Sequence, residues 1–198
     1  MSALPAPAAT TATVARKRRR PGRGTLVALL LAALLAGAGA LAAVTLTGDE
    51  APPAAPAAGT PALLTTGTLE AVRAAVGHDV YGIAAPAGTR PEVTRGSDGE
   101  VWVRYLSGDA TVGDPRADYL TIGTYPRGDA LAAAKAAAEG GRSRSIALPD
   151  GGVMLWSLER PESVYAAGPG SNLLIEVYSP DPERARALVS GGAVAPLR

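Results

Sequence analysis

The segment EVWVRYL, residues 100–106, is the clearest β-strand signal in this chain, and its fold is best derived outward from there. β-Branched and aromatic residues dominate it, as they do in strands that pack on one side. Successive side chains of a strand point to opposite faces. One face would carry Trp102, Arg104 and Leu106, and the other would carry Val101, Val103 and Tyr105. The segment therefore predicts a strand with one face against a core.

Strand signals of the same kind follow toward the C-terminus. They lie in DYLTIGTY (118–125), VMLWSLE (153–159) and NLLIEVY (172–178), with weaker ones at 79–83, 91–95, 143–148 and 163–167. The turn sequences between them include Asp98-Gly99 and Asp150-Gly151. Glycine takes the positive φ that tight hairpins need. We therefore expect the strands to pair antiparallel.

Three segments predict helices through their capping residues. They are residues 68–77, 128–141 and 179–192. In the last, Asp181 is a suitable cap, Pro182 fits the first helical position and Gly191 fits the stop. Asp129 and Gly140 are the expected cap and stop of the second helix. With the strands, these helices predict the α+β class, in which one antiparallel sheet carries two or three helices against a face.

The order of the elements suggests two half-repeats of the βββα type. DGEVWVRY begins at Asp98 and DGGVMLWS at Asp150, and YLTIGTYP can be set beside NLLIEVYSP. The alignment places Trp102 and Trp156 on equivalent faces of their halves, because their offset is an even number of residues. Chance similarity in an alanine- and glycine-rich chain is the alternative interpretation.

An apolar segment near the N-terminus, Leu26 to Leu46, follows the basic run Arg16 to Arg20 and contains no charged residue. As a helix it would be about 31 Å long, which matches the bilayer hydrocarbon at about 30 Å. The positive-inside rule keeps the basic flank in the cytoplasm. We therefore expect a single-pass signal anchor. The small-x-small patterns around Ala40 leave a cleaved signal, and hence a secreted domain, as the alternative.

The chain thus divides into four parts. Residues 1–24 are expected to form a disordered basic cytoplasmic tail, 25–47 the transmembrane helix, 48–61 a Pro/Ala-rich linker, and 62–198 an extracytoplasmic α+β domain. Small side chains recur every four residues along the predicted membrane helix, which suits helix-mediated self-association. These are Ala28, Ala32, Ala36 and Ala40.

Charge is distributed unequally along the chain. Six of the 19 basic residues and none of the 18 acidic residues precede the apolar segment, which leaves 13 basic against 18 acidic residues, a net charge of −5. A negative domain repels phosphate backbones, which argues against nucleic acid as a partner. The absence of cysteine excludes disulfides, thiol catalysis and zinc–cysteine sites.

Recognised motifs for catalysis or cofactor binding are lacking in the sequence. His78, the only histidine, lies at an expected helix end, where a capping contact is the ordinary explanation. The chain has no nucleophile elbow, phosphate-binding loop or dinucleotide fingerprint, so no cofactor is predicted. The loop SGDATVGDPRAD holds Asp109, Asp114 and Asp118, but the spacing differs from that of an EF-hand and a solvated loop is the favoured interpretation.

The aromatic residues suggest a candidate binding surface. Trp102 and Arg104 share one strand face, and Trp156 and Tyr178 lie on other expected strands. An open sheet face that carries amphipathic rings is suited to ligand contact. Burial of both tryptophans in the core is the alternative interpretation.

The layout of basic tail, apolar helix, Pro/Ala spacer and small α+β domain resembles uncharacterised single-pass membrane-anchored exported proteins of high-GC Gram-positive bacteria. Within the domain, Ala85 to Gly88, Val101 to Tyr105 and a closing helix are similar to one domain family of unknown function among them. The resemblance implies an exported α+β domain and supplies no activity, cofactor or site residue.

These observations favour a membrane-anchored extracytoplasmic module that binds a cell-envelope component or a partner protein and is not an enzyme. A cell-envelope hydrolase that uses a carboxylate pair is the alternative, since two acidic residues far apart in sequence can meet in a fold.

Overall fold

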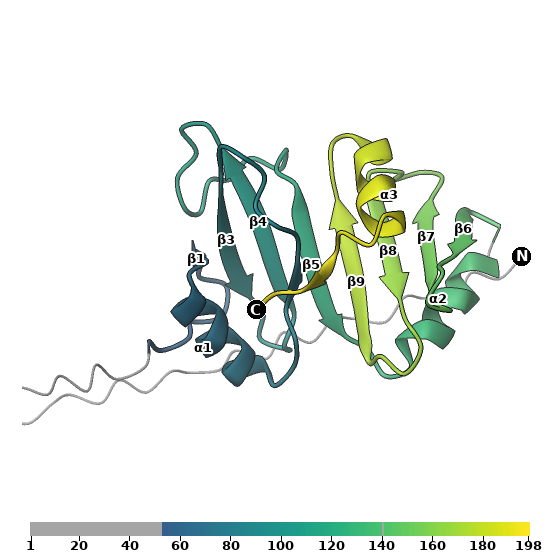
Figure 1. Cartoon of the computed structure of the whole chain (residues 1–198), viewed down its shortest axis with the longest axis horizontal. Helices are drawn as coiled ribbons and strands as arrows, with labels where there is room; N and C mark the ends of the chain where they lie inside the picture. The colour runs from purple at the N-terminus through teal and green to yellow at the C-terminus, as the bar shows by residue number, and fades with distance from the viewer. Residues whose placement is uncertain (1–52, 140) are drawn as a thin grey trace, which may run out of the picture. The chain divides into compact units, whose positions relative to one another are not determined.

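The structure is a computed structural model, and it describes residues 53–139 and 141–198 (Figure 1). The predicted tail (1–24) and transmembrane helix (25–47), and the helix stop expected at Gly140, lie outside the described residues. Among the helices in the described part of the chain, none has the length and apolar character needed to cross a membrane.

An eight-stranded sheet forms the centre of the domain, and every neighbouring pair in it is antiparallel. In spatial order its strands are β1 (Ala62–Leu63), β3 (Thr89–Arg95), β4 (Val101–Ser107), β5 (Thr121–Pro126), β9 (Leu173–Tyr178), β8 (Ser163–Ala167), β7 (Val153–Ser157) and β6 (Ser143–Ala147). A second, two-stranded sheet pairs β2 (Tyr81–Gly82) with β10 (Ala195–Pro196). The predicted α+β class is confirmed.

Three helices complete the domain: α1 (Thr66–Val76), α2 (Ala130–Glu139) and α3 (Pro182–Ser190). The caps predicted for the last helix are confirmed. The Asp181 side chain accepts hydrogen bonds from the backbone N–H groups of Glu183 and Arg184, with Pro182 in the first turn. Asp129 likewise accepts from Ala132 N–H at the start of α2.

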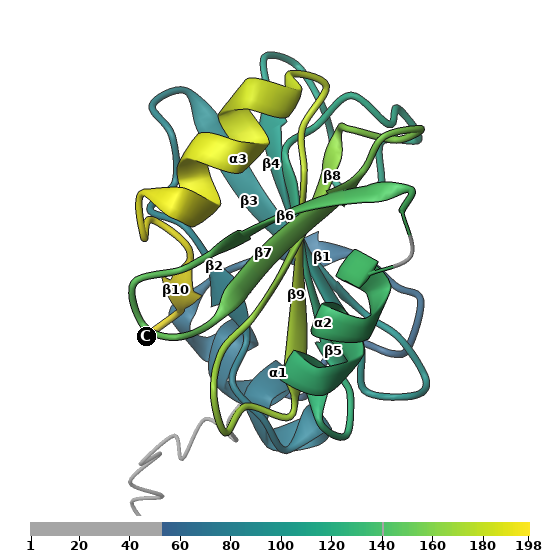
Figure 2. The same ribbon diagram turned by 90° about the vertical axis from the view of Figure 1, so that its right-hand side faces the viewer.

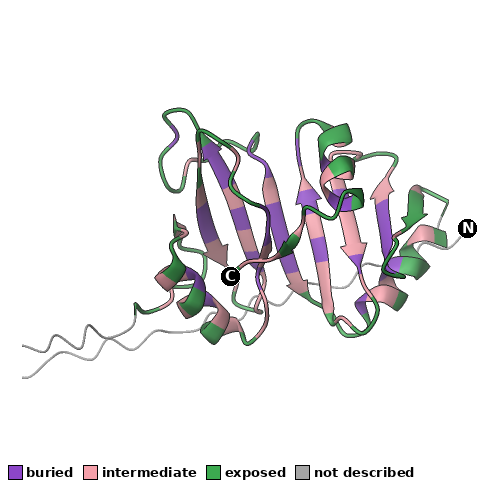
Figure 3. Cartoon of the chain, in the orientation of Figure 1, coloured by how far each residue is buried: buried purple, intermediate pink, exposed green. Residues whose placement is uncertain are grey.

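The two faces of the sheet carry different helices. Val103, Ile122, Val177 and Val164 are paired across β4, β5, β9 and β8, so they share one face, and all four are buried. Buried residues of α1 and α3 belong to the same core cluster, so we call this side the α1/α3 face. The opposite side is the α2 face, where alanines of α2 pack on β7 and β8. Figure 2 shows α2 and α3 on opposite sides of the strands, and Figure 3 shows burial alternating along most of β4. The helices therefore cover both faces, whereas the sequence predicted one.

The strand order is symmetric about the central pair β5–β9, with β3-β4-β5 on one side and β9-β8-β7 on the other. In the chain each set of three strands is followed by a helix, α2 after β5 and α3 after β9. Counted outward from that pair, β4 corresponds to β8 and β3 to β7. The alignment of Asp98 with Asp150 instead matches β4 with β7, because it passes over the weak strand β8. The alignment is therefore displaced by one strand, and a duplication stays a prediction.

Part of the predicted linker (48–61) is bound to the sheet. Gly59 N–H donates to the Arg95 carbonyl at 2.8 Å, and Arg95 Nε donates to the Pro56 carbonyl at 2.6 Å. Pro61 lies beside the β4–β5 loop, within contact distance of a Cβ placed on Gly113. The folded domain thus begins before residue 62.

Candidate functional site

A row of side chains on the α2 face crosses the centre of the sheet. Trp102 on β4 pairs with Gly123 on β5, Gly123 pairs with Glu176 on β9, and Glu176 pairs with Tyr165 on β8. Paired residues of an antiparallel sheet lie side by side on one face. The register therefore aligns an indole, a gap, a carboxylate and a phenol.

The gap at Gly123 is filled by the ring of Tyr125, two residues along the same strand. A Cβ on Gly123 would come within 2.7 Å of the Tyr125 ring and hydroxyl. Since no side chain occupies position 123, the ring lies across it and the hydroxyl falls between the two neighbouring strands. A glycine inside a strand commonly marks such a close approach.

Hydrogen bonds link the four polar groups of this row. Trp102 Nε1 donates to the Tyr125 hydroxyl at 2.9 Å, and that hydroxyl donates to Glu176 Oε2 at 2.6 Å. Tyr165 donates its hydroxyl proton to Glu176 Oε1 at 3.0 Å. The indole and the Tyr125 ring meet edge to face, with centroids 6.1 Å apart and an interplanar angle of 78°. We call Trp102, Tyr125, Tyr165 and Glu176 the tyrosine–glutamate site.

The tyrosine hydroxyls of the site are held in the protonated form. Burial raises the pKa of Tyr165 to about 12, with further contributions from the Glu176 charge and the hydrogen bond to it. Burial, followed by the hydrogen bond to Glu176, raises the pKa of Tyr125 well above its ordinary value. At neutral pH both phenols therefore remain donors to the carboxylate, and the arrangement is fixed.

A cavity of about 380 Å³ opens over the site. Its lining comprises Asp98, Glu100, Tyr125, Pro126, Arg127, Tyr165, Leu174 and Glu176. Next to it, a second cavity of about 310 Å³ lies between α2 and the sheet, lined by Arg127, Ala133, Ala134, Ala137, Ser143, Leu155, Ser157, Tyr165 and Leu174. Both volumes fall at the lower end of the range for ligand pockets. Since the cavities share three lining residues, they adjoin one another.

The structure separates the four residues of the predicted binding surface. Trp102, Arg104 and Tyr178 lie on the α2 face, because Arg104 and Tyr178 both pair with Thr121. Trp156 pairs with Val164 and so lies on the α1/α3 face, where Arg186 stacks on its ring at 5.2 Å. The prediction that the two tryptophans share equivalent faces is therefore wrong. Both are only partly buried.

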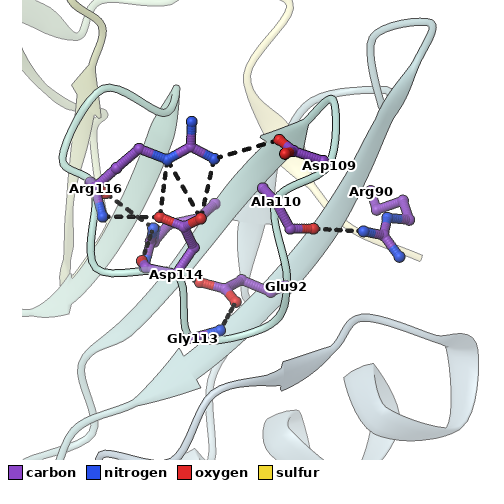
Figure 4. A network of polar contacts seen from close by, with 8 residues as sticks. Arg90, Glu92, Asp109, Ala110, Gly113, Asp114 and Arg116 are labelled. Carbon is purple, nitrogen blue, oxygen red and sulfur yellow. Dashed lines mark hydrogen bonds and ion pairs between the residues drawn. The ribbon is translucent and has the colours of Figure 1, made fainter.

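The Arg104 guanidinium forms an ion pair with Glu92 and hydrogen bonds with the backbone of the β4–β5 loop. Its guanidinium lies 3.0 Å from the carboxylate of Glu92, whose side chain is 1% exposed, and donates to the Asp114 carbonyl at 2.7 Å. Glu92 in turn accepts from Gly113 N–H at 2.8 Å, as Figure 4 shows. An arginine so engaged positions the loop and is not free for a ligand.

Two of the three acidic residues in the loop that was compared with an EF-hand, a calcium-binding motif, lie close to Arg116. Arg116 donates to both carboxylate oxygens of Asp114 (Figure 4). Those hydrogen bonds lower the pKa of Asp114 to about 2. Asp109 is fully exposed, and within residues 53–139 and 141–198 no three acidic or histidine side chains group as a metal site would need. The loop geometry follows from its ion pairs.

His78 bridges two backbone segments. Nδ1 lies 2.7 Å from the Asp79 carbonyl, and Nε2 lies 2.7 Å from the Gly99 carbonyl in the β3–β4 turn. With both ring nitrogens occupied by carbonyl oxygens, the imidazole fastens the turn to the segment after α1. This is the contact of a structural residue, near the helix end as the sequence predicted.

Three residues of the site, Tyr125, Tyr165 and Glu176, were not singled out from the sequence. The sequence holds a signal for two of them, Glu176 and Tyr125. Glu176 is a charged residue within the apolar strand LLIEVY, and Gly123 interrupts the strand TIGTY. Comparison with protein-family models, curated proteins and solved structures finds no match for this chain.

Proposed function

We propose that the chain is a membrane-anchored extracytoplasmic binding module whose ligand occupies the cavity over the tyrosine–glutamate site. One observation carries the choice of site: an interlinked indole, two phenols and a carboxylate line or adjoin a cavity on rigid sheet strands. Sites built on strands are held more precisely than sites on loops. The membrane anchor and the extracytoplasmic location rest on the basic and apolar segments between residues 16 and 46.

Binding is favoured over hydrolysis by the state of Glu176. Both of its carboxylate oxygens already accept a tyrosine hydroxyl proton. In a hydrolase of this kind one carboxyl group carries the proton that it delivers to the leaving group. The two tyrosine O–H groups instead hold Glu176 as an acceptor, with one lone pair left on each oxygen for a ligand donor. The hydrolase alternative therefore gains no support from this cavity, although Asp98 and Glu100 also line it.

The two tryptophans supply the test. The full chain is labelled with isotope-enriched tryptophan, and its two indole N–H signals are followed by NMR as soluble cell-wall fragments of a high-GC Gram-positive bacterium are added. We expect the Trp102 signal to move, because its N–H contacts Tyr125 in the site. The Trp156 signal, from the other face, should stay unchanged. If neither signal moves, or both move equally, the proposal fails.

A further inference from the structure

The ligand class can be derived from the charges and shapes of the two adjoining cavities, an inference that rests on the proposed function. Three carboxylates, those of Asp98, Glu100 and Glu176, line the first cavity against one guanidinium, that of Arg127. The lining thus has a formal excess of two negative charges. A cleft lined mainly by one sign of charge concentrates ligands of the opposite sign and repels those of the same sign.

The aromatic groups in the first cavity suit a cation as well. The rings of Tyr125 and Tyr165 line it together with the carboxylate that they hold. Aromatic rings attract ammonium and guanidinium groups through their quadrupole, and organic ammonium ions gain more than strongly hydrated metal ions do. The two phenols donate their protons to Glu176 and so hold the carboxylate in place, while one lone pair on each carboxylate oxygen remains for a ligand N–H.

The second cavity adds an apolar compartment. The side chains of α2 that line it are all alanines, Ala133, Ala134 and Ala137, and on the sheet side Leu155 and Leu174 face them. Alanine extends only one carbon from the helix, so α2 packs on the sheet through Ala130 and Ala134 and leaves space beside them. Ala137 is exposed, so this space opens to solvent and an apolar group can enter it from the surface. Tyr165 and Leu174 line both cavities, so a ligand in the first cavity lies next to this space.

We propose that the adjoining cavities bind an organic ammonium ion that carries a short apolar group, with the charged group beside Glu176 and the apolar group between α2 and the sheet. The carboxylates select the charge, and the alanine-lined space selects for a tail. Free amines of this type and amine groups on larger envelope molecules share the same chemistry.

The test uses n-hexylammonium as the probe and the full chain with labelled tryptophan as the receptor. We expect hexylammonium to move the Trp102 indole signal and leave the Trp156 signal in place. 1-Hexanol, which has the tail without the charge, should bind about tenfold more weakly than hexylammonium. Methylammonium, which lacks five methylene groups, should bind at least about tenfold more weakly, because each buried methylene contributes about 0.8 kcal/mol. Hexanoate should not compete. Raising the salt concentration should weaken the binding of hexylammonium, because salt screens the attraction between charges, and should leave the binding of hexanol unchanged.

Matched variants assign each part of the ligand to its cavity. Glu176→Gln should weaken hexylammonium about tenfold, whereas Glu159→Gln, an exposed loop residue, should leave binding unchanged. Ala137→Leu extends a side chain into the second cavity and should weaken hexylammonium but not methylammonium. Ala136→Leu, on the same helix and outside that lining, is its control. If Glu176→Gln does not fold, Asp98→Asn with Glu100→Gln lowers the cavity charge without touching the hydrogen-bond network.

Two results would overturn the inference: hexanol or hexanoate binding as tightly as hexylammonium, or hexylammonium leaving the Trp102 signal unmoved. The proposed function is judged separately by the cell-wall fragments. If the fragments move the Trp102 signal and hexylammonium does not, the site binds a ligand of another class. If hexylammonium binds and the fragments do not, the ligand class stands and the envelope component is wrong.

Discussion

At the scale of single residues, the site depends on the missing side chain at position 123. Trp102 and Glu176 flank Gly123 on the adjacent strands, and both bond to the hydroxyl of Tyr125, whose ring lies over it. Any larger residue at 123 would occupy the place of that ring. The glycine is therefore a determinant of the site although it contacts no ligand.

Gly123→Ala tests this role. The new Cβ would lie within 2.7 Å of Tyr125, so the ring must move and its two hydrogen bonds must break. We expect a loss of about 1–3 kcal/mol in the free energy of unfolding, as for other overpacked positions, and a displaced Trp102 indole signal. Gly128→Ala is the control, because no atom lies within 4 Å of the added Cβ. An unchanged Trp102 signal in Gly123→Ala would contradict the role assigned to the glycine.

Arg104 is a second residue whose role the packing decides. Arg104→Met removes the cation next to Glu92, which is buried, and leaves an uncompensated charge. We expect the free energy of unfolding to fall by about 3 kcal/mol, measured by urea denaturation. Replacing Glu92 with Met in the same chain should recover most of that loss. Arg144→Met, on the exposed edge strand β6, should have little effect; an equal loss there would contradict the prediction.

The raised pKa of Tyr165 predicts that the domain loses stability at alkaline pH. Its pKa is raised from 10.0 to about 12 in the folded domain, so the folded state retains a proton that the unfolded chain releases. The stabilisation is complete below pH 10.0 and declines as the pH rises toward about 12. Urea denaturation across that window should show a smaller decline for Tyr165→Phe than for the unchanged chain. Parallel declines would mean that Tyr165 is not the group that titrates.

At the scale of elements, the Pro/Ala segment before β1 behaves as part of the sheet domain. Two hydrogen bonds join Pro56 and Gly59 to Arg95 on β3. Prolines make the segment stiff, so a small number of contacts suffices to hold it along the strand. The Pro/Ala-rich composition that predicted a free spacer is thus equally compatible with a segment that packs along the edge of a sheet.

Removing this segment measures its contribution. A chain of residues 53–198 should be more stable than one of residues 62–198 by about 1–3 kcal/mol, since two hydrogen bonds are lost with the segment. Thermal unfolding of the two chains gives the comparison. Arg95→Met should lower the free energy of unfolding of the longer chain by part of this difference. In the shorter chain, which lacks Pro56, the same substitution should have almost no effect. Equal stability of the two chains would show that residues 53–61 add nothing.

At the scale of the whole molecule, the proposed orientation places the sheet domain outside the cytoplasm. The chain contains no cysteine, so a single introduced thiol reports on one position only. Ala57→Cys, an exposed position, should react with a membrane-impermeant thiol reagent on intact protoplasts. Ala9→Cys should react only after lysis. The reverse pattern would exclude the orientation. A mature N-terminus at Leu41 or Ala43 would identify a cleaved signal instead of an anchor.

The sequence by itself determined the class of the domain and most of its elements. Alternating β-branched and aromatic residues predicted β4, β5, β7 and β9, and Asp181 with Pro182 predicted the start of α3, because strand period and helix capping are properties of neighbouring residues. Within β4, the separation of Val103 from Trp102 was also predictable from alternation alone.

The tertiary structure decided which strands are neighbours and in what register, and therefore which residues meet. Tyr125 and Glu176 stand 51 residues apart, and no local pattern relates them. Trp156 was assigned to the wrong face because the half-repeat alignment matched β4 with β7 and left out β8. The face of a residue on β7 depends on how β7 pairs with β8 and β8 with β9, which the alignment did not include. Alternation orders side chains only within one strand. The pairing of strands is decided by how the whole sheet buries its core against α1, α2 and α3, so the tyrosine–glutamate site exists only in the folded domain.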